Sequence, residues 1–547
     1  MDADRPARVF PALVRHFFSR FFDKESLSPQ GEPEAGVIQT LAILATPGAF
    51  LALLFQPLTV RGWDLVLVRY VFLSFSMVGM GIIMVFEWDA LFPDRRDYQV
   101  LTPQPLRIST LFLSKAAALA IFLGMFLADI NLLSTLFWPG IDGRAGAFAT
   151  MGVHLLVMTV GGLFFALALG ALQGVLITVL RGSLYRRVSV FLQTLAMALL
   201  VMMLFVSWLA ASRLKWVAEQ HPAWLYYFPG FWFVGLYERL RPATHNAVLR
   251  DVGRFGWIGL ACAAAVFLLT FLPGYRHHAR RVLEGGAGLS LPRQADRPAR
   301  SRLQRLILPN PVEWAVFRFI TETVTRSTKH RFFLATYGGF GAAMAVLTLP
   351  SGRSGLVELP LELSFVLVSG LRAAFNFPSE LSANWAFRLT ETEGIQPYLS
   401  ATRKWIVLCG VLPLFLLLTP VEFAFFDWRL AVFHLAYGIA LSLLLVEIMF
   451  FGFRKAPFTC AHFPGKVNLV FLSVIYILGF SMYSGHMADL ENWLATQPFA
   501  AAGFFIVAAG AWRILSYFSR RLLGPKPSLD YENPGDPVVR TLGIAVR

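Results

Sequence analysis

The chain alternates long apolar runs with short polar segments. A helix of roughly 20 apolar residues crosses a bilayer core about 30 Å thick, and twelve runs approach that length. They are Val37–Phe55, Leu65–Phe86, Leu111–Leu132, Met151–Leu180, Val188–Leu209, Trp257–Leu272, Phe332–Leu349, Leu359–Phe375, Trp405–Thr419, Leu430–Phe453, Val467–Met482 and Phe499–Leu515. Leu359–Phe375 and Trp405–Thr419 are short; for both, the alternatives are a tilted segment, a re-entrant segment or a span whose ends are placed wrongly. The pattern predicts an all-α polytopic membrane protein with about 12 transmembrane helices.

Composition excludes a soluble protein of this size. Hydrophobic residues make up 56% of the 547 residues and charged residues only 15%, which leaves too little polar surface. Cys262, Cys409 and Cys460 give no disulfide framework, and Cys460 with His462 lacks the ligand number of a zinc site. Residues 1–36 lack the apolar core of a cleavable signal peptide.

The basic residues predict which side of the membrane each loop faces. With the N-terminus in the cytoplasm, most of the 48 Lys and Arg residues fall in cytoplasmic loops, in agreement with the positive-inside rule. The formal charge of +15 then faces anionic lipid, so no nucleic-acid partner is expected. We expect a multi-pass protein of the cell (cytoplasmic or inner) membrane, with both termini cytoplasmic.

Two polar segments share one pattern. The first, hinge 1, runs from Glu87 to Lys115, and the second, hinge 2, runs from Phe377 to Lys404. Each contains a Phe-Pro pair and a Leu-Thr pair, and each ends on a basic residue directly before the next apolar run. The pairs are Phe92-Pro93 with Leu101-Thr102, and Phe377-Pro378 with Leu389-Thr390. Their positions predict that the membrane body is duplicated and that a partner outside the membrane contacts it at both hinges.

The same order of segments recurs on both sides of a basic linker. It predicts a cytoplasmic N-terminus with an interfacial helix (1–36), a six-span half (37–274), a linker (275–309), a second half with its own interfacial lead-in helix (310–517) and a cytoplasmic tail (518–547). Six is an even number, so the halves are parallel repeats related by an axis along the membrane normal. His154 and His434, which open the fourth and tenth spans, are a further small agreement.

One long loop, 211–256, lies on the expected outer side. Trp224, Tyr226, Tyr227 and Trp232 crowd around Pro229-Gly230. Trp and Tyr favour the membrane–water boundary, and Pro-Gly interrupts a helix. The loop is therefore either a short re-entrant or interfacial hairpin, or a plain aromatic belt.

Motifs of catalysis are absent from the sequence. It contains no Gly-x4-Gly-Lys-Ser/Thr phosphate loop, no His-Glu-x-x-His and no Gly-x-Ser-x-Gly, so we expect no enzyme and no cofactor or metal bound by this chain. Charges within spans are costly and often functional. Glu447 lies deepest and is the best candidate for a contact with a neighbouring helix. Glu87 and Arg372 hold equivalent positions before the two Phe-Pro pairs and are a candidate pair between the halves.

Hinge 1 contains a Leu- and Pro-rich series that ends on a lysine: Leu101-Thr102-Pro103, Pro105-Leu106-Arg107, Leu111, Leu113 and Lys115. This series resembles the coupling segment of ABC-2 type permeases. In that family the segment follows the second span, lies in the cytoplasm and docks into a cleft of the ATPase subunit. The order of lead-in helix, six spans and outer hairpin is also similar. Hinge 2 departs from the pattern, because Glu391, Glu393 and Gly394 replace the Pro-rich turn.

The resemblance implies the membrane permease subunit of an ATP-binding cassette exporter, with two fused six-span halves. ATP would then be bound by a separate ATPase subunit that is present in two copies. The implied partner-binding residues are Leu101, Thr102, Pro103, Leu106, Arg107, Lys115, Leu389, Thr390, Arg403 and Lys404. A 12-span secondary transporter driven by an ion gradient is the alternative. It requires buried acidic or histidine relays.

Overall fold

The computed structural model is all-α throughout the part of the chain that it describes. The described residues are 5–22, 48, 50–55, 61–88, 108–143, 145–180, 182–220, 223–244, 246–284, 302–379, 381–391, 394–460, 469–522 and 528–531. The chain divides into two compact units, unit 1 (Met1–Arg293) and unit 2 (Gln294–Arg547). The division falls within the segment 275–309 that the sequence assigns to a linker.

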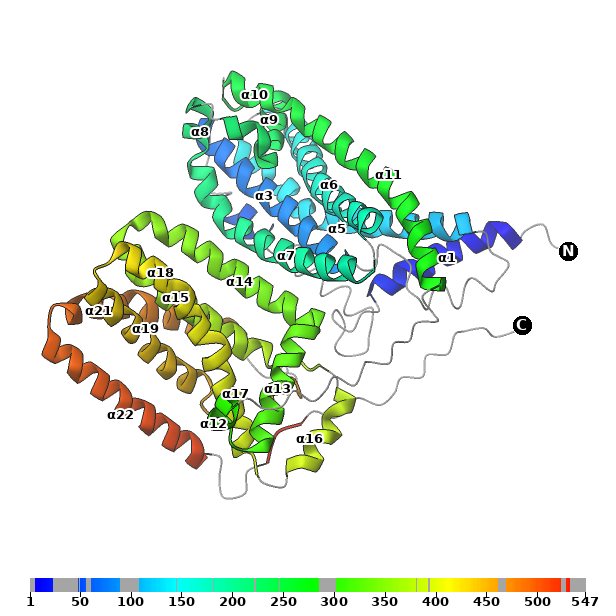
Figure 1. Cartoon of the computed structure of the whole chain (residues 1–547). Helices are drawn as coiled ribbons and strands as arrows, with labels where there is room; N and C mark the ends of the chain where they lie inside the picture. Colours follow the sequence, from blue (N-terminus) through cyan, green and yellow to red (C-terminus); the bar gives the residue numbers. More distant parts are fainter. Residues whose placement is uncertain are drawn as a thin grey trace. The chain divides into compact units, whose positions relative to one another are not determined.

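Unit 1 is built from long helices and a group of short ones (Figure 1). Its helices are α1 (Arg5–Phe22), α3 (Gly62–Phe86), α5 (Ile108–Asp142), α6 (Ala147–Val179), α7 (Gly182–Ser212), α8 (Leu214–Gln220), α9 (Pro229–Leu240), α10 (Ala247–Val252) and α11 (Arg254–Glu284). Helix α11 continues ten residues beyond the expected end of the first half at 274. The start of the expected linker is therefore helical.

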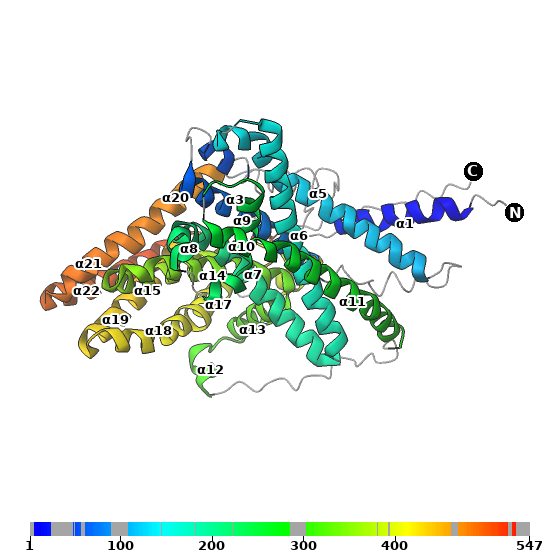
Figure 2. The ribbon, with the colours of Figure 1, turned by 90° about the horizontal axis from the view of Figure 1, so that it is seen from above.

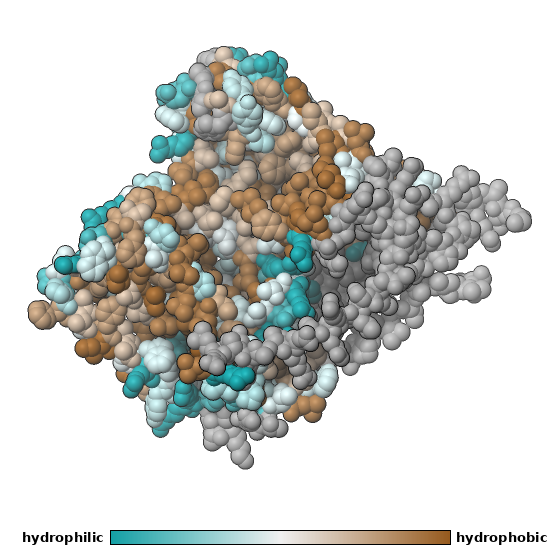
Figure 3. All heavy atoms as spheres, viewed as in Figure 1, coloured by the Kyte–Doolittle hydropathy of each residue, from teal (hydrophilic) through white to brown (hydrophobic). Residues whose placement is uncertain are grey.

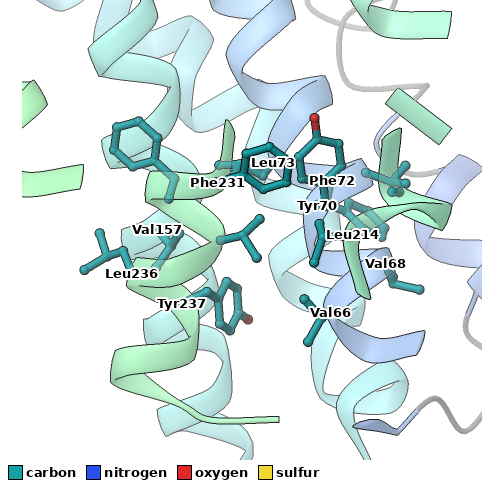
Figure 4. Close-up of a cluster of buried hydrophobic side chains, with 14 of the residues drawn as sticks. Val66, Val68, Tyr70, Phe72, Leu73, Val157, Leu214, Phe231, Leu236 and Tyr237 are labelled. Atoms are coloured by element: carbon teal, nitrogen blue, oxygen red, sulfur yellow. The ribbon is translucent and has the colours of Figure 1, made fainter. Parts of the chain in front are cut away.

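Helix α3 forms the centre of unit 1. It is apolar around its whole circumference, and α5, α6, α7 and α9 pack around it. Figure 4 shows Tyr70 and Phe72 of α3 beside Phe231 and Tyr237 of α9. Lipid is as apolar as these side chains, so close packing holds membrane helices together. Gly161 of α6 permits it, because an added Cβ there would lie 2.6 Å from Leu73.

Unit 2 contains α12 (Arg302–Ile307), α13 (Pro311–Arg326), α14 (Thr328–Thr348), α15 (Arg353–Ala374), α16 (Trp385–Thr390), α17 (Gln396–Ile406), α18 (Leu412–Phe425), α19 (Trp428–Met449), α20 (Leu469–Ser481), α21 (Met487–Ala495) and α22 (Pro498–Leu522). A π-helical stretch, Val407–Val411, joins α17 to α18, and a second, Met482–His486, joins α20 to α21. In Figure 1, α16 lies at one end of unit 2, and α21 lies at the other.

Ten helices in the described residues are long and apolar enough to cross a membrane. Both short runs belong to such helices, because their spans are Arg353–Ala374 and Gln396–Phe425. The two other expected spans, Val37–Phe55 and Val467–Met482, fall partly on residues outside the described part. Apolar side chains cover much of the face shown in Figure 3. The chain is thus a multi-pass membrane protein in contact with lipid.

The two units share a set of helix pairings. Helix α1 packs on α5 in unit 1 (Figure 2), and α13 packs on α17 in unit 2. Helix α3 packs on α6, as α15 does on α19, and α6 packs on α11, as α19 does on α22. In each unit the lead-in helix therefore contacts the helix that follows the hinge, and the second span contacts the fourth.

Candidate functional site

Most of hinge 1 lies outside the described residues. This applies to the predicted partner-binding residues Leu101, Thr102, Pro103, Leu106 and Arg107. The structure does describe the two ends of hinge 1, at Glu87-Trp88 and at Lys115. They show how the membrane body holds the chain at this point.

Polar side chains fix the end of α3 where it leads into hinge 1. Trp88 is fully buried and donates from Nε1 to Ser189 Oγ at 2.9 Å. Gln193 Nε2 donates to the carbonyl of Val85 at 3.0 Å, and Gln173 Nε2 donates to the carbonyl of Trp88. These side chains come from α6 and α7, so three helices meet at this exit. Sequence patterns did not single out Gln173, Ser189 or Gln193.

Lys115 contacts the lead-in helix of its own unit. Its side chain is buried, and Nζ lies 5.6 Å from the ring centre of Phe17 in α1. A cation over an aromatic face is attracted by the ring quadrupole. Lys115 therefore links α5, which follows hinge 1, to α1.

Hinge 2 forms a short exposed helix and then a buried one. In α16, Trp385 is 64% exposed and Leu389 is 67% exposed. The hydroxyl groups of Thr390 and Tyr398 lie 2.9 Å apart and form a hydrogen bond, which ties α16 to α17. Residues Tyr398, Leu399 and Trp405 of α17 are buried in the core of unit 2. Hinge 2 thus exposes two large apolar side chains on α16, which is held by its hydrogen bond to the buried helix α17.

Glu391, which departs from the family pattern, anchors the segment 528–531. Its carboxylate accepts from the backbone N–H of Leu529 at 2.5 Å and from the Tyr531 hydroxyl at 2.9 Å. The Arg388 guanidinium lies 5.3 Å from the centre of the Tyr531 ring. Burial, with the hydrogen bond to Glu391, raises the pKa of the Tyr531 hydroxyl. No local sequence pattern indicates this contact, since 138 residues separate Glu391 from Leu529.

The turn after α19 braces the start of hinge 2. The backbone N–H of Ser379 donates to the carbonyl of Phe458 at 3.0 Å, and the N–H of Phe458 donates to the carbonyl of Phe375 at 3.1 Å. Asn384 Nδ2 donates to the carbonyl of Thr459 at 2.7 Å. Phe458 has a φ of 64°, which is rare for a bulky residue. These hydrogen bonds and ring contacts with Phe319 and Phe375 hold it there.

Arg403 and Lys404 contact side chains of their own unit. Lys404 Nζ lies 2.8 Å from Glu313 Oε2 of α13 and donates to the carbonyl of Ile307 at 3.0 Å. Arg403 lies 3.5 Å from Glu447 and donates to Ser519 Oγ at 2.8 Å. Contact of these two residues with a partner protein stays a prediction, while Glu447 has the neighbouring-helix contact expected of it.

Arg372 is also held within unit 2. Its Nε donates to the carbonyl of Met449 at 3.1 Å, and its guanidinium lies 4.6 Å from the ring centre of Phe453. Glu87 is buried at the end of α3 in unit 1. A pair between Glu87 and Arg372 stays a prediction.

A buried ion network closes the end of unit 1 remote from hinge 1. Arg69 of α3 bonds Glu238 of α9 at 2.5 Å and lies 3.7 Å from Asp142 of α5. Arg241 donates to Asp142 at 3.1 Å. The Arg69 guanidinium lies 4.0 Å from the ring centre of Tyr237, whose hydroxyl is 3.2 Å from His154 Nδ1. Two basic side chains thus face two acidic ones. Helix α9, which belongs to the expected outer hairpin, supplies Glu238 and is therefore a structural part of this cluster.

Unit 2 has a different polar cluster at the corresponding end. His434 of α19 bonds Glu491 of α21 through Nδ1, and its Nε2 lies 3.5 Å from Glu422 of α18. All three side chains are at most 3% exposed. His434 was noted in the sequence, but nothing there linked it to Glu422 or Glu491.

Hinge 2 is the described site with features of a docking surface. It combines exposed apolar side chains with internal links to α13, α19 and the segment 528–531. Within the described residues, no group of three or more His, Cys, Asp or Glu is placed to hold a metal ion. Comparisons with protein-family models, curated proteins and solved structures found no match.

Proposed function

We propose that this chain is the permease subunit of an ATP-binding cassette exporter, with two six-span halves fused in one chain. ATP would be hydrolysed by a separate subunit that docks at the hinges. The hinge end would face the cytoplasm, with both termini on that side. One observation carries the proposal: in both units, the basic residue that ends the hinge is joined to the lead-in helix.

This link has different chemistry in the two units. Lys115 lies over Phe17 of α1, whereas Lys404 pairs with Glu313 of α13. The shared connection and the shared helix pairings support a parallel duplication. A force-bearing hinge needs this connection, because movement of an isolated loop would not displace the span that follows it.

Hinge 2 offers a path from its surface into the membrane. A partner that binds Trp385 and Leu389 would displace α16, and the Thr390–Tyr398 hydrogen bond would pass the displacement to α17. Lys404 and Arg403 would then carry it to α13 and α19. Because α17 continues through the π-helical stretch into α18, the displacement of α17 would also move the membrane span that α18 forms.

Purification of the tagged chain from its native membrane in mild detergent tests the proposal. We expect a soluble subunit with ATPase activity in the eluate. Leu101→Asp, Arg107→Glu or Leu389→Asp should remove most of that activity, since each places an unfavourable charge at the expected contact. The matched control is Leu522→Asp, which alters a half-exposed leucine at the end of α22.

The result has two readable outcomes. Loss of ATPase activity with the hinge variants and its retention with Leu522→Asp supports the exporter. A chain that purifies alone, without ATPase activity, and catalyses proton-coupled uptake in vesicles contradicts it.

A second candidate function, a secondary transporter driven by an ion gradient, is favoured by one feature. That feature is the buried cluster of His434, Glu422 and Glu491. Buried acidic and histidine side chains within membrane proteins often form proton relays. Transport by the purified chain in vesicles, with a proton gradient and no ATP, distinguishes this candidate from the exporter.

A further inference from the structure

The His434 cluster lies at the end of unit 2 away from α16, where α18, α19 and α21 meet (Figure 1). Each ring nitrogen of His434 faces a carboxylate oxygen, Glu491 Oε1 at Nδ1 and Glu422 Oε1 at Nε2. An imidazole must carry a proton on a nitrogen in order to donate from it. With both nitrogens protonated, His434 supplies one positive charge to the cluster.

The cluster then holds one negative charge too many. Two ionised carboxylates face a single imidazolium, and all three are almost fully buried. An uncompensated charge in a low-dielectric interior costs several kcal/mol and is usually removed by a change of protonation. A second proton, on Glu422 or Glu491, makes the cluster neutral.

The charged neighbours of the cluster do not supply the missing positive charge. Arg353 of α15 lies against the ring of Phe426, at 5.7 Å, and Arg429 lies over Trp428. Tyr437 donates its hydroxyl to the carbonyl of Met487. The remaining charged or titratable side chains near this end are Glu358 and Glu362 of α15, Asp427, which caps α19, and the exposed Asp489 and His486. Glu362 accepts a hydrogen bond from Thr348. Helix α22 carries no charged residue before Arg513.

Unpartnered atoms within the cluster point to the same conclusion. Among the described residues, Glu422 Oε2, Glu491 Oε2 and His434 Nε2 are buried without a hydrogen-bond partner. Buried polar atoms without partners are uncommon in folded proteins. A proton on one of these carboxyl oxygens removes negative charge from a buried atom that has no donor to stabilise it.

The corresponding end of unit 1 shows the contrast. There Arg69 and Arg241 face Glu238 and Asp142, so two basic side chains offset two acidic ones. Both ends contain a histidine, His154 or His434, but in unit 2 it is the histidine itself, and not an arginine, that faces the two acids. The difference replaces a permanent charge with a titratable one.

We propose that His434, Glu422 and Glu491 form a proton-binding site, with one exchangeable proton held by the two carboxyl groups in addition to the proton on His434. The route for exchange is a cavity of about 540 Å³ lined by Arg353, Leu356, Phe426, Asp427 and Leu430. Phe426 separates it from the cluster, with its ring 5.7 Å from that of His434. Water in this cavity delivers a proton to a carboxyl oxygen and receives it on release. The proposal does not depend on an ATPase partner.

Infrared difference spectroscopy of the full chain in lipid nanodiscs tests this site. At pH 7 the wild type should show the C=O stretch of a protonated carboxylic acid, which shifts in D₂O and is lost as the pH is raised. Glu422→Gln or Glu491→Gln should remove an intensity equal to one carboxyl group. Asp489→Asn, an exposed acid two residues before Glu491 on the same helix, should leave the band unchanged.

A second arm needs no change within the cluster. Glu362→Gln serves as the background, because Glu362 is a separate buried acid that accepts from Thr348. The band should persist there and still titrate. If no protonated-carboxyl band is present in this background at pH 7, or if both glutamine variants keep the full wild-type band, the proposal is overturned.

Discussion

At the scale of single residues, Arg403 and Lys404 join parts of unit 2 that lie far apart in the sequence. These two residues are the basic end of hinge 2. Lys404 pairs with Glu313, and Arg403 donates to Ser519 and lies 3.5 Å from Glu447. Glu313 lies 91 residues before Lys404, and no local pattern joins the two. Pairings between distant residues follow from packing, which periodicity does not encode.

The pair Lys404–Glu313 should contribute measurably to stability. Its side chains are 35% and 11% exposed, so we expect a coupling free energy of about 1 kcal/mol, between surface and buried values. Lys404→Met, Glu313→Gln and the double variant form a double-mutant cycle, followed by unfolding in detergent. As a control, Arg326→Met, which breaks an exposed pair with Glu322, should cost less than about 0.5 kcal/mol. Additive single changes in the cycle would show that the pair is not coupled.

At the scale of elements, hydropathy predicted the ten spans that the described residues contain, but it placed some of their ends wrongly. The run Trp405–Thr419 is part of a helix from Gln396 to Phe425. Lys404 and Arg403 in its early turns pair with Glu313 and Glu447, so the helix begins before the apolar run does. The aromatic loop 211–256 contains α8, α9 and α10, and Phe231, Phe233 and Tyr237 enter the core of unit 1. Lipid and protein interior are both apolar, so composition alone did not separate a belt from a packed hairpin.

The contact between α9 and α10 should not tolerate a side chain. A Cβ on Gly235 would lie 2.3 Å from the carbonyl oxygen of Leu249, and a Cβ on Gly253 would lie 2.4 Å from the backbone of Gly235. We expect Gly235→Ala or Gly253→Ala to destabilise unit 1 by about 1–3 kcal/mol through overpacking. Thermal unfolding in nanodiscs measures it. Gly510→Ala, in open space on α22, should be neutral or stabilising; equal effects at all three sites would contradict this account.

At the scale of the whole molecule, the sequence predicted two parallel halves. The chain divides into two units that share three helix pairings, and the repeat itself stays a prediction. Their polar clusters were beyond prediction, although His154 and His434 marked both places. Glu422, near the end of α18, and Glu491, in the short helix α21, both lie outside the spans that hydropathy predicted. Only the fold brings them to His434.

The proposed topology predicts opposite reactivity at the two ends of unit 2. In a background with the three native cysteines replaced by alanine, Asp489→Cys should react with a membrane-impermeant maleimide on intact cells. Arg388→Cys, at hinge 2, should react only after permeabilisation, since positive residues favour the cytoplasmic side. Labelling of Arg388→Cys on intact cells would place the hinge outside and remove the basis for an ATPase partner.

The π-helical stretch Val407–Val411 determines which way α18 faces. Such a stretch adds one residue to a turn, and one residue corresponds to about 100° of rotation. Before it, Thr402 and Ile406 point inward; after it, Val411, Phe415, Leu418 and Glu422 do. An uninterrupted α-helical repeat from Thr402 would turn Glu422 toward the acyl chains. The one additional residue in this stretch therefore orients the Glu422 carboxylate toward His434.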